Sequence, residues 1–277
     1  MRARRMSWLI AVVAVYVALC ATAYLLQRSF MYFPMGTLGA PGDVGLNGFA
    51  AVRLETADGL KLVAWYRAPP EEAASVMVLF HGNAGTIADR AFKAEAFAQA
   101  GLGVLLVEYR GYGGNPGAPS ETGFYEDARA AARFLEGRGI ARGRWVLYGE
   151  SIGAGPALEL ARALSASGQG VAGGVILEAA FTSTAAVAAR HYWFLPTRLI
   201  VRDRFENADK IAHIGAPLLI LHGERDEIVP AAHARRLFEL AREPKSLTLV
   251  SEAGHNNLWG PEAAAAVIAF VRSVRAR

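Results

Sequence analysis

The first feature of the sequence that could take part in a reaction is a serine flanked by two glycines. Gly149-Glu150-Ser151-Ile152-Gly153 matches the pattern G-x-S-x-G, with an apolar run before it and helically spaced apolar residues after it. This context predicts a sharp strand-to-helix turn that exposes the serine hydroxyl, the nucleophile elbow. Glycines are expected on either side of the serine because neighbouring backbone leaves no room for a Cβ atom in such a turn. The start of the following helix favours negative charge that develops near the serine during a reaction. The alternative, a serine that only caps a helix, is less consistent with this setting.

A nucleophilic serine needs a base that takes its proton. His255 is predicted to be that base, because it lies between the apolar run 246–250 and the last helical pattern, in a loop at the same edge of the sheet as the serine. His81 and His222 end strands and suit shaping roles, and His191 lies in an aromatic insertion. The remaining two histidines are expected to be structural or solvated: His213 and His233.

The base in turn needs a carboxylate that fixes its tautomer and stabilises its charged form. Asp226 follows the apolar run 218–221, and the chain order Ser151, Asp226, His255 is the order expected of an elbow-type hydrolase. Glu178, at the end of the preceding strand, is the alternative acid. Glu224 and Glu227 are expected to be solvated loop charges.

The tetrahedral intermediate of acyl transfer requires two backbone N–H donors, an oxyanion hole. Ile152, the residue after the serine, should provide one, and Asn83 in the loop after the strand 76–80 should provide the other. His, Cys and carboxylate residues show no metal-ligand spacing, and the chemistry needs no cofactor, so we expect neither.

The elements that must position these residues alternate along the chain. A hairpin is predicted at 52–66, followed by apolar strands within 76–83, 103–113, 145–151, 173–181, 218–229 and 246–250. Helical patterns follow at 88–101, 120–139, 153–166, 231–242 and 262–277. The alternation predicts an α/β fold with a mostly parallel sheet flanked by helices, whose working residues gather at the carboxyl ends of the strands.

The N-terminus differs from the rest of the chain. Trp8 to Leu26 is an apolar run of 19 residues, preceded by arginines and followed by Gln27 and Arg28, long enough to cross a bilayer as a helix. The positive-inside rule then places the N-terminus in the cytoplasm and the catalytic domain outside. A cleaved signal sequence is the alternative, since Ala21-Thr22-Ala23 fits a cleavage site and the protein would then be secreted. We therefore expect an anchor at 1–28, a linker at 29–50, and a catalytic domain at 51–277 with a short cap near 182–214.

The charge and the cysteine content indicate which classes of partner and which covalent cross-links the chain can have. The net charge is +4, but without Arg2, Arg4, Arg5 and Arg28 the chain has 25 basic and 25 acidic residues. The folded part therefore gives no basic signal for nucleic acid, and the membrane is the partner expected of the N-terminal helix. The single cysteine, Cys20, excludes an intrachain disulfide.

Several segments together resemble a known group: "HGNAG", "YRGYG", "PSE", "GESIG", "FTS", "HGERDEIVP", "GHNNL" and, after the anchor, "QRSFMYFP". The chain is similar to the α/β-hydrolase superfamily and, within it, to the membrane-associated abhydrolase-domain serine hydrolases. The resemblance implies Ser151 as nucleophile, Asp226 as acid, His255 as base and Asn83 in the oxyanion hole. Ala180 and Gly114 depart from the pattern but do not touch this chemistry.

These residues predict a serine hydrolase that cleaves carboxylic ester or thioester bonds through an acyl-enzyme. An acyltransferase, a peptidase or amidase with the same triad, and a non-catalytic binding domain are the alternatives. His81, Tyr192, Trp193 and Phe194 are the candidate substrate-pocket residues. Because the cap is short, we expect an open site for short or medium acyl chains.

Overall fold

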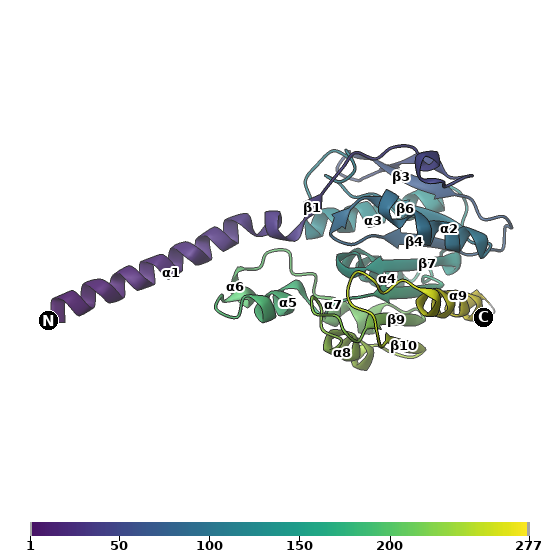
Figure 1. The fold of residues 1–277 in the computed structure, drawn as a ribbon. Coiled ribbons are helices and arrows are strands. Elements are labelled where there is room, and N and C mark those ends of the chain that lie inside the picture. Colours follow the sequence, from purple (N-terminus) through teal and green to yellow (C-terminus); the bar gives the residue numbers. More distant parts are fainter. Residues whose placement is uncertain (1, 276–277) are drawn as a thin grey trace.

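The computed structural model describes residues 2–275, without the side chains of residues 2–4. Met1 and the last two residues of the predicted C-terminal helix therefore lie outside the described residues. A long N-terminal helix, α1 (Arg2–Met31), projects from a body of sheet and helices. Figure 1 shows its outer end far from the body and its inner end beside the body.

An eight-stranded sheet forms the centre of the body. Its order is β10-β9-β8-β7-β4-β6-β3-β2. The hairpin strands β2 and β3 pair antiparallel, β3 also pairs antiparallel with β6, and all other neighbours are parallel, as the alternation of elements predicts. The strands are β2 (Ala50–Glu55), β3 (Lys61–Arg67), β4 (Val76–Phe80), β6 (Gly103–Val107), β7 (Trp145–Glu150), β8 (Gly174–Glu178), β9 (Leu218–Gly223) and β10 (Lys245–Val250).

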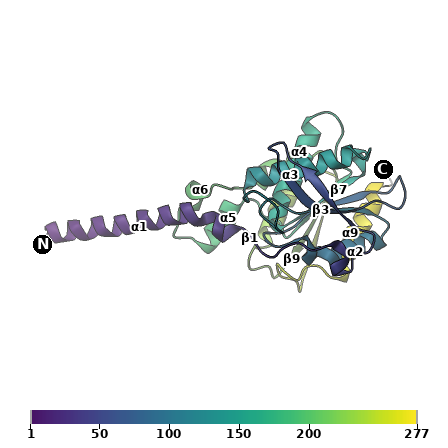
Figure 2. The same ribbon diagram turned by 90° about the horizontal axis from the view of Figure 1, so that it is seen from above.

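Helices cover both faces of this sheet, which therefore buries two apolar cores (Figure 2). Alternation along β4 shows the division: Val76, Val78 and Phe80 pack into one core, and Met77 and Leu79 into the other. Helices α3 (Glu121–Glu136), α4 (Ala154–Ala166) and α8 (Ala232–Leu240) contribute to the first core. Helix α9 (Pro261–Arg275) and helix α2 (Ala91–Gln99) contribute to the second.

The predicted cap consists of short helices between β8 and β9: α5 (Thr184–His191), α6 (Thr197–Ile200) and α7 (Asn207–Lys210). In Figure 1, α5 and α6 lie beside the body at the side from which α1 projects. Helix α1 continues past residue 28 to Met31, and β1 (Phe33–Pro34) then pairs with β5 (Ala84–Gly85), which follows the carboxyl end of β4. The start of the predicted linker is therefore helical and tied to the sheet edge.

Polar contacts join α1 to the cap across more than 170 positions of sequence. The Arg28 guanidinium donates to both carboxylate oxygens of Asp203, at 2.8 and 3.0 Å, and the Tyr32 hydroxyl donates to the same carboxylate. The Gln27 side chain donates to the Ile200 carbonyl, and farther out the Tyr16 hydroxyl donates to the Phe194 carbonyl at 2.9 Å. The polar contacts between the cap and α1 thus extend from Tyr16 to Arg28, about 18 Å at 1.5 Å of rise per residue.

Candidate active site

Ser151 lies at the turn between β7 and the 3-10 helix Ser151–Gly153 that leads into α4. Its φ of 51° falls in the left-handed region, a strained conformation for a residue with a Cβ atom. The flanking glycines are needed: a Cβ on Gly149 would lie 2.6 Å from the Ala154 Cα, and one on Gly153 would overlap the Phe80 carbonyl. The local sequence therefore folds into the predicted sharp turn.

His255 lies beside this serine and Asp226 lies behind His255. The His255 Nε2 is 3.1 Å from the Ser151 Oγ, and its Nδ1 is 2.7 Å from the Asp226 Oδ2. Because an ionised carboxylate only accepts hydrogen bonds, Nδ1 carries the hydrogen and Nε2 is free to accept one from the serine hydroxyl. The structure thus brings together the three residues selected from the sequence.

The Asp226 carboxylate has partners on both oxygens. Oδ1 accepts from the Ile228 and Val229 amides at 2.9 and 2.7 Å, and the His222 Nε2 lies 3.3 Å from Oδ2. Burial raises the pKa of Asp226, but the hydrogen bonds from His222, His255 and Val229 outweigh it and hold the pKa well below its usual range. Asp226 is therefore a fixed negative charge behind the imidazole.

Glu178, the alternative acid, belongs to a separate buried cluster. The Lys93 ammonium lies 2.6 Å from a Glu178 oxygen and 2.8 Å from a Glu150 oxygen, and the Arg90 guanidinium donates to Glu150 at 2.6 Å. The Tyr148 hydroxyl also donates to Glu178. Burial opposes ionisation of Glu150, but Lys93 and Arg90 prevail and lower its pKa. We call Arg90, Lys93, Glu150 and Glu178 the buried charge cluster, and these four residues line a cavity together with Ser151.

Sequence reasoning missed Lys93, whose side chain is only 3% exposed. Burial lowers the pKa of this lysine, but Glu178 and Glu150 more than offset it, so the pKa is raised and the ammonium stays charged. A signal was present in the sequence: Lys93 lies four positions before Phe97, on the apolar face of α2. A lysine on an apolar helical face needs a buried partner, and two glutamates near strand ends could supply it.

The two residues predicted for an oxyanion hole lie near Ser151 in different segments. Ile152 follows Ser151 at the helix start, and Asn83 lines the space beside Ser151. The Asn83 side-chain amide donates to the Met31 carbonyl at 3.0 Å, so the side chain is held by the end of α1. The prediction for the oxyanion hole concerns the backbone N–H of Asn83 rather than this side chain.

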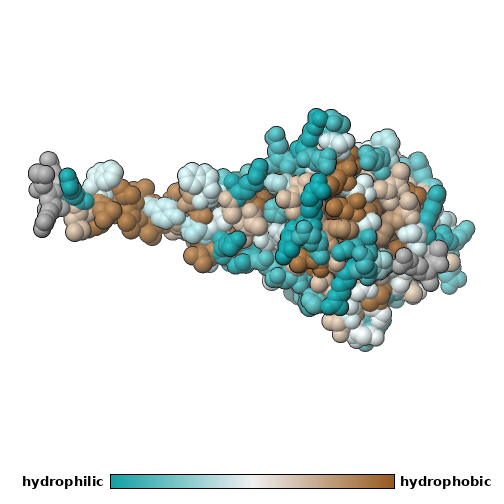
Figure 3. All heavy atoms as spheres, turned by 90° about the horizontal axis from the view of Figure 1, so that it is seen from below, coloured by the Kyte–Doolittle hydropathy of each residue, from teal (hydrophilic) through white to brown (hydrophobic). Residues whose placement is uncertain are grey.

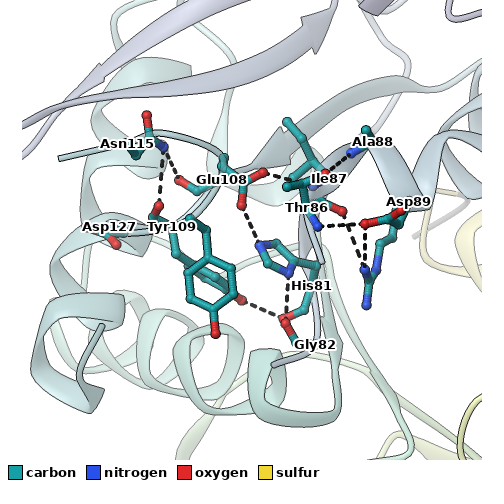
Figure 4. Close-up of polar contacts among 12 residues, drawn as sticks. His81, Gly82, Thr86, Ile87, Ala88, Asp89, Glu108, Tyr109, Asn115 and Asp127 are labelled. Carbon is teal, nitrogen blue, oxygen red and sulfur yellow. Dashed lines mark hydrogen bonds and ion pairs between the residues drawn. The ribbon is translucent and has the colours of Figure 1, made fainter. Parts of the chain in front are cut away.

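His81 is not a pocket residue, contrary to the sequence-based expectation. It is fully buried, with Nε2 2.8 Å from a Glu108 oxygen and Nδ1 2.8 Å from the Gly82 carbonyl, as Figure 4 shows. Glu108 also accepts from the Ile87 amide. His81 and Glu108 therefore brace the loop that carries Asn83 from within.

Two cavities of different character meet at Ser151. A polar cavity of about 200 Å³ reaches the buried charge cluster, and a mainly apolar cavity of about 830 Å³ reaches the cap and α1. Tyr192 and Phe194 line the apolar cavity as predicted, whereas Trp193 lines neither cavity and is 82% exposed. Five residues border both cavities: Asn83, Ala84, Ser151, His255 and Asn256.

Metal-ligating side chains do not gather at this edge. Among residues 2–275, no group of three or more His, Cys, Asp or Glu side chains is placed to hold a metal ion. The polar groups around Ser151 instead bond to one another, within the Ser151–His255–Asp226 chain and the buried charge cluster.

Comparisons with known proteins show which sequences this chain is similar to. Residues 71–202 match the family model described as serine aminopeptidase, S33. A Mycobacterium tuberculosis protein is 39% identical over 252 residues, covering 88% of both chains. The human alpha/beta hydrolase domain-containing protein 17B is 31% identical over 209 residues, covering 73% of this chain and 68% of its own.

Solved structures share the fold. An esterase from Pyrococcus furiosus superposes with a TM-score of 0.70 at 19% identity, covering 88% of this chain and 98% of its own. At that identity the likeness speaks for the architecture alone. With the sequence relatives it confirms the predicted fold class, and the chain is a member of the α/β-hydrolase family.

Proposed function

We propose that this protein is a serine hydrolase that cleaves carboxylic esters through an acyl-enzyme intermediate. The observation that carries the proposal is the continuous hydrogen-bonded chain from the Ser151 hydroxyl through His255 to the buried Asp226 carboxylate. Family membership supports hydrolase chemistry, and the strained turn at Ser151 supports a nucleophilic role for that serine.

Acylation begins when the Ser151 Oγ attacks the ester carbonyl and its proton passes to the His255 Nε2. The carbonyl oxygen becomes negative, and the Ile152 and Asn83 amides stabilise it. Asp226 stabilises the imidazolium. Collapse of the tetrahedral intermediate breaks the bond to the alcohol, which leaves with the proton from His255.

Deacylation repeats these steps with water. His255, neutral again, takes a proton from a water molecule as the water oxygen attacks the acyl carbonyl. The second tetrahedral intermediate collapses, releases the carboxylic acid, and returns the proton to the Ser151 Oγ. An acyltransferase would follow the same path with an alcohol in place of water.

We further propose that α1 anchors the enzyme in a membrane. Residues 5–31 form a helix long and apolar enough to cross a bilayer, and its projecting part is mainly hydrophobic in Figure 3. The arginines at its start favour a cytoplasmic N-terminus and an extracytoplasmic catalytic domain. Protease digestion of intact spheroplasts tests this orientation: degradation of the catalytic domain is expected, and full protection would contradict it.

Ester turnover by the full chain in detergent tests the proposed chemistry. With p-nitrophenyl butyrate, the wild-type protein should release nitrophenol under multiple turnover, and Ser151→Ala should fall to the background rate. The matched control Ser183→Ala alters a serine that caps α5 and should retain turnover. No turnover by a folded wild-type protein would contradict the proposal, and parallel measurement with p-nitrobutyranilide separates ester from amide cleavage.

A further inference from the structure

Helix α1 forms part of the larger cavity beside Ser151. Residues of α1 line it at Leu19, Thr22, Ala23, Gln27, Phe30 and Met31. The opposite wall is the cap, with Val187, Tyr192, Phe194, Leu195 and Ile200 among its residues. A segment long enough to span a membrane therefore shares a cavity with the candidate nucleophile.

The shape of this cavity fits an extended apolar chain. From Met31, near Ser151, to Leu19 the lining follows α1 for 12 residues, about 18 Å at 1.5 Å per residue. That length is close to the hydrocarbon depth of one leaflet, half of about 30 Å. At about 830 Å³, the cavity lies in the upper part of the usual range for small-molecule sites, roughly 300–1,000 Å³.

The outer cap resembles a membrane-contacting surface. Trp193 and Leu199 are 82% and 84% exposed, and Tyr192 and Phe194 are about half exposed. Exposed aromatics of this kind suit the membrane interface, and the exposed Arg198 and Arg202 beside them suit lipid phosphates. The Tyr16–Phe194 hydrogen bond places this surface alongside the candidate spanning segment.

We propose that α1 is a wall of the acyl-binding site, and that the acyl chain of a long-chain ester enters this site from the bilayer, between α1 and the cap. This inference rests on the proposed function and names its substrate class. The earlier expectation of short or medium chains assumed that the cap alone enclosed the acyl group, whereas residues of α1 form a second wall opposite the cap. Cleavage after Ala23 would remove Leu19, Thr22 and Ala23 from that wall.

The polar cavity takes the alcohol portion of the ester. Its lining includes Arg90 and Lys93, but both already pair with Glu150, and Glu178 and Asp89 add two further carboxylates. Three carboxylates against two cations give a formal charge of −1. A small uncharged hydroxylated alcohol therefore suits this side better than an anionic headgroup.

A steric variant on α1 tests the acyl wall. Ala23→Trp puts a large side chain into the cavity, and the matched control Ala21→Trp makes the same change at an exposed position outside the lining. Both full-length variants are compared with wild type in phosphatidylcholine nanodiscs, on p-nitrophenyl palmitate and p-nitrophenyl butyrate. The two esters share a leaving group, so their rate ratio reports the acyl side alone.

Ala23→Trp should lower the palmitate-to-butyrate ratio of kcat/KM by about tenfold or more, because blocking a few methylene positions removes about 0.8 kcal/mol each. Ala21→Trp should leave the ratio within about twofold of wild type. Unchanged ratios in both variants would overturn the inference, while retained butyrate turnover shows that the catalytic residues still work. A wild-type protein inert to both esters would instead overturn the proposed function.

A second measurement tests the acyl wall without ester turnover, so that it can be read even if the wild-type protein hydrolyses neither ester. The Ser151→Ala variant in nanodiscs is mixed with a palmitoyl ester that carries a photoreactive diazirine on its acyl chain. The sample is irradiated, and the labelled residues are located by mass spectrometry. Saturable labelling of the 19–31 segment, suppressed by excess unlabelled palmitoyl ester and by Ala23→Trp, supports the wall. Labelling that excess ester does not suppress reflects bulk lipid contact and overturns it.

Discussion

The two sides of Ser151 are built differently. On the polar side, Lys93, Glu150 and Glu178 are held by α2, β7 and β8, and the ion pairs of this cluster are 2.6–2.8 Å long, with Lys93 and Glu178 almost fully buried. On the apolar side, α1 and the cap meet through a few contacts, of which the Arg28–Asp203 pair is partly exposed. The polar side belongs to the sheet, whereas the apolar side is assembled from segments at its periphery. The polar side of Ser151 is therefore held by the core of the fold, whereas in our proposal chain-length selectivity depends on the peripheral wall that α1 forms.

The largest expected effect lies behind His255, one of the residues that border both cavities. Asp226→Asn should lower kcat for p-nitrophenyl butyrate by about 10³–10⁴-fold, because an amide no longer fixes the His255 tautomer or stabilises its cation. Glu227→Gln, an exposed neighbour, is the matched control and should remain near wild type. A small effect of Asp226→Asn would mean that another carboxylate supports His255.

Next in size is the loss of the cation on the polar side. Lys93→Met should lower the free energy of unfolding by about 3–5 kcal/mol, because it leaves Glu150 and Glu178 with unbalanced buried charge. Thermal unfolding of the full chain in detergent measures this. The double variant Lys93→Met/Glu178→Gln should recover part of the loss; no recovery would contradict the assigned ion pair.

The pH dependence of the free energy of unfolding tests whether Glu150 is ionised within the buried charge cluster. The pKa of Glu150 is lowered from its ordinary value of 4.5, so its contribution is fully present above pH 4.5 and is lost as the pH falls through the folded-state pKa. Glu150→Gln should therefore destabilise the protein by about 2 kcal/mol at pH 7, and the difference from wild type should shrink below pH 4.5. The exposed control Glu239→Gln should show little effect at either pH. A difference that is constant with pH would exclude an ionised Glu150.

The smallest expected effect concerns the join between α1 and the cap. Asp203→Asn weakens the contacts with Arg28 and Tyr32, at a cost of about 1 kcal/mol because Arg28 is partly exposed. The palmitate-to-butyrate rate ratio should fall by a few fold, with butyrate turnover unchanged. Glu206→Gln, a cap carboxylate paired with Arg204, serves as the control. An equal loss on both esters would show that the join supports the whole fold rather than the acyl wall.

The residues that sequence analysis located best are those whose position follows from topology. Ser151, Asp226 and His255 each follow a strand of a parallel sheet, and the carboxyl ends of such strands meet at one edge. The fold class is predictable for the same reason, since the apolar strands and the helical patterns alternate clearly.

The residues that it misplaced depend on contacts that no local pattern encodes. His81 follows a strand, as a pocket residue would, but its burial depends on Glu108, 27 positions away. Trp193 and Phe194 are neighbours in a segment that is neither helix nor strand. Because such a segment has no regular spacing of buried residues, the sequence could not show which of the two rings lines the cavity. The cavity between α1 and the cap depends on contacts between segments far apart in the sequence, such as the Arg28–Asp203 pair across 175 positions.

Covalent labelling by a fluorophosphonate probe tests the central claim most directly, because it requires an activated serine and no particular substrate. The full-length wild-type protein in detergent is incubated with the probe, and the modified residue is located by mass spectrometry beside Ser151→Ala and Asp226→Asn. Labelling is expected at Ser151 alone, absent in Ser151→Ala and strongly slowed in Asp226→Asn. An unlabelled but folded wild-type protein, or labelling at another serine that persists in Ser151→Ala, would contradict the account.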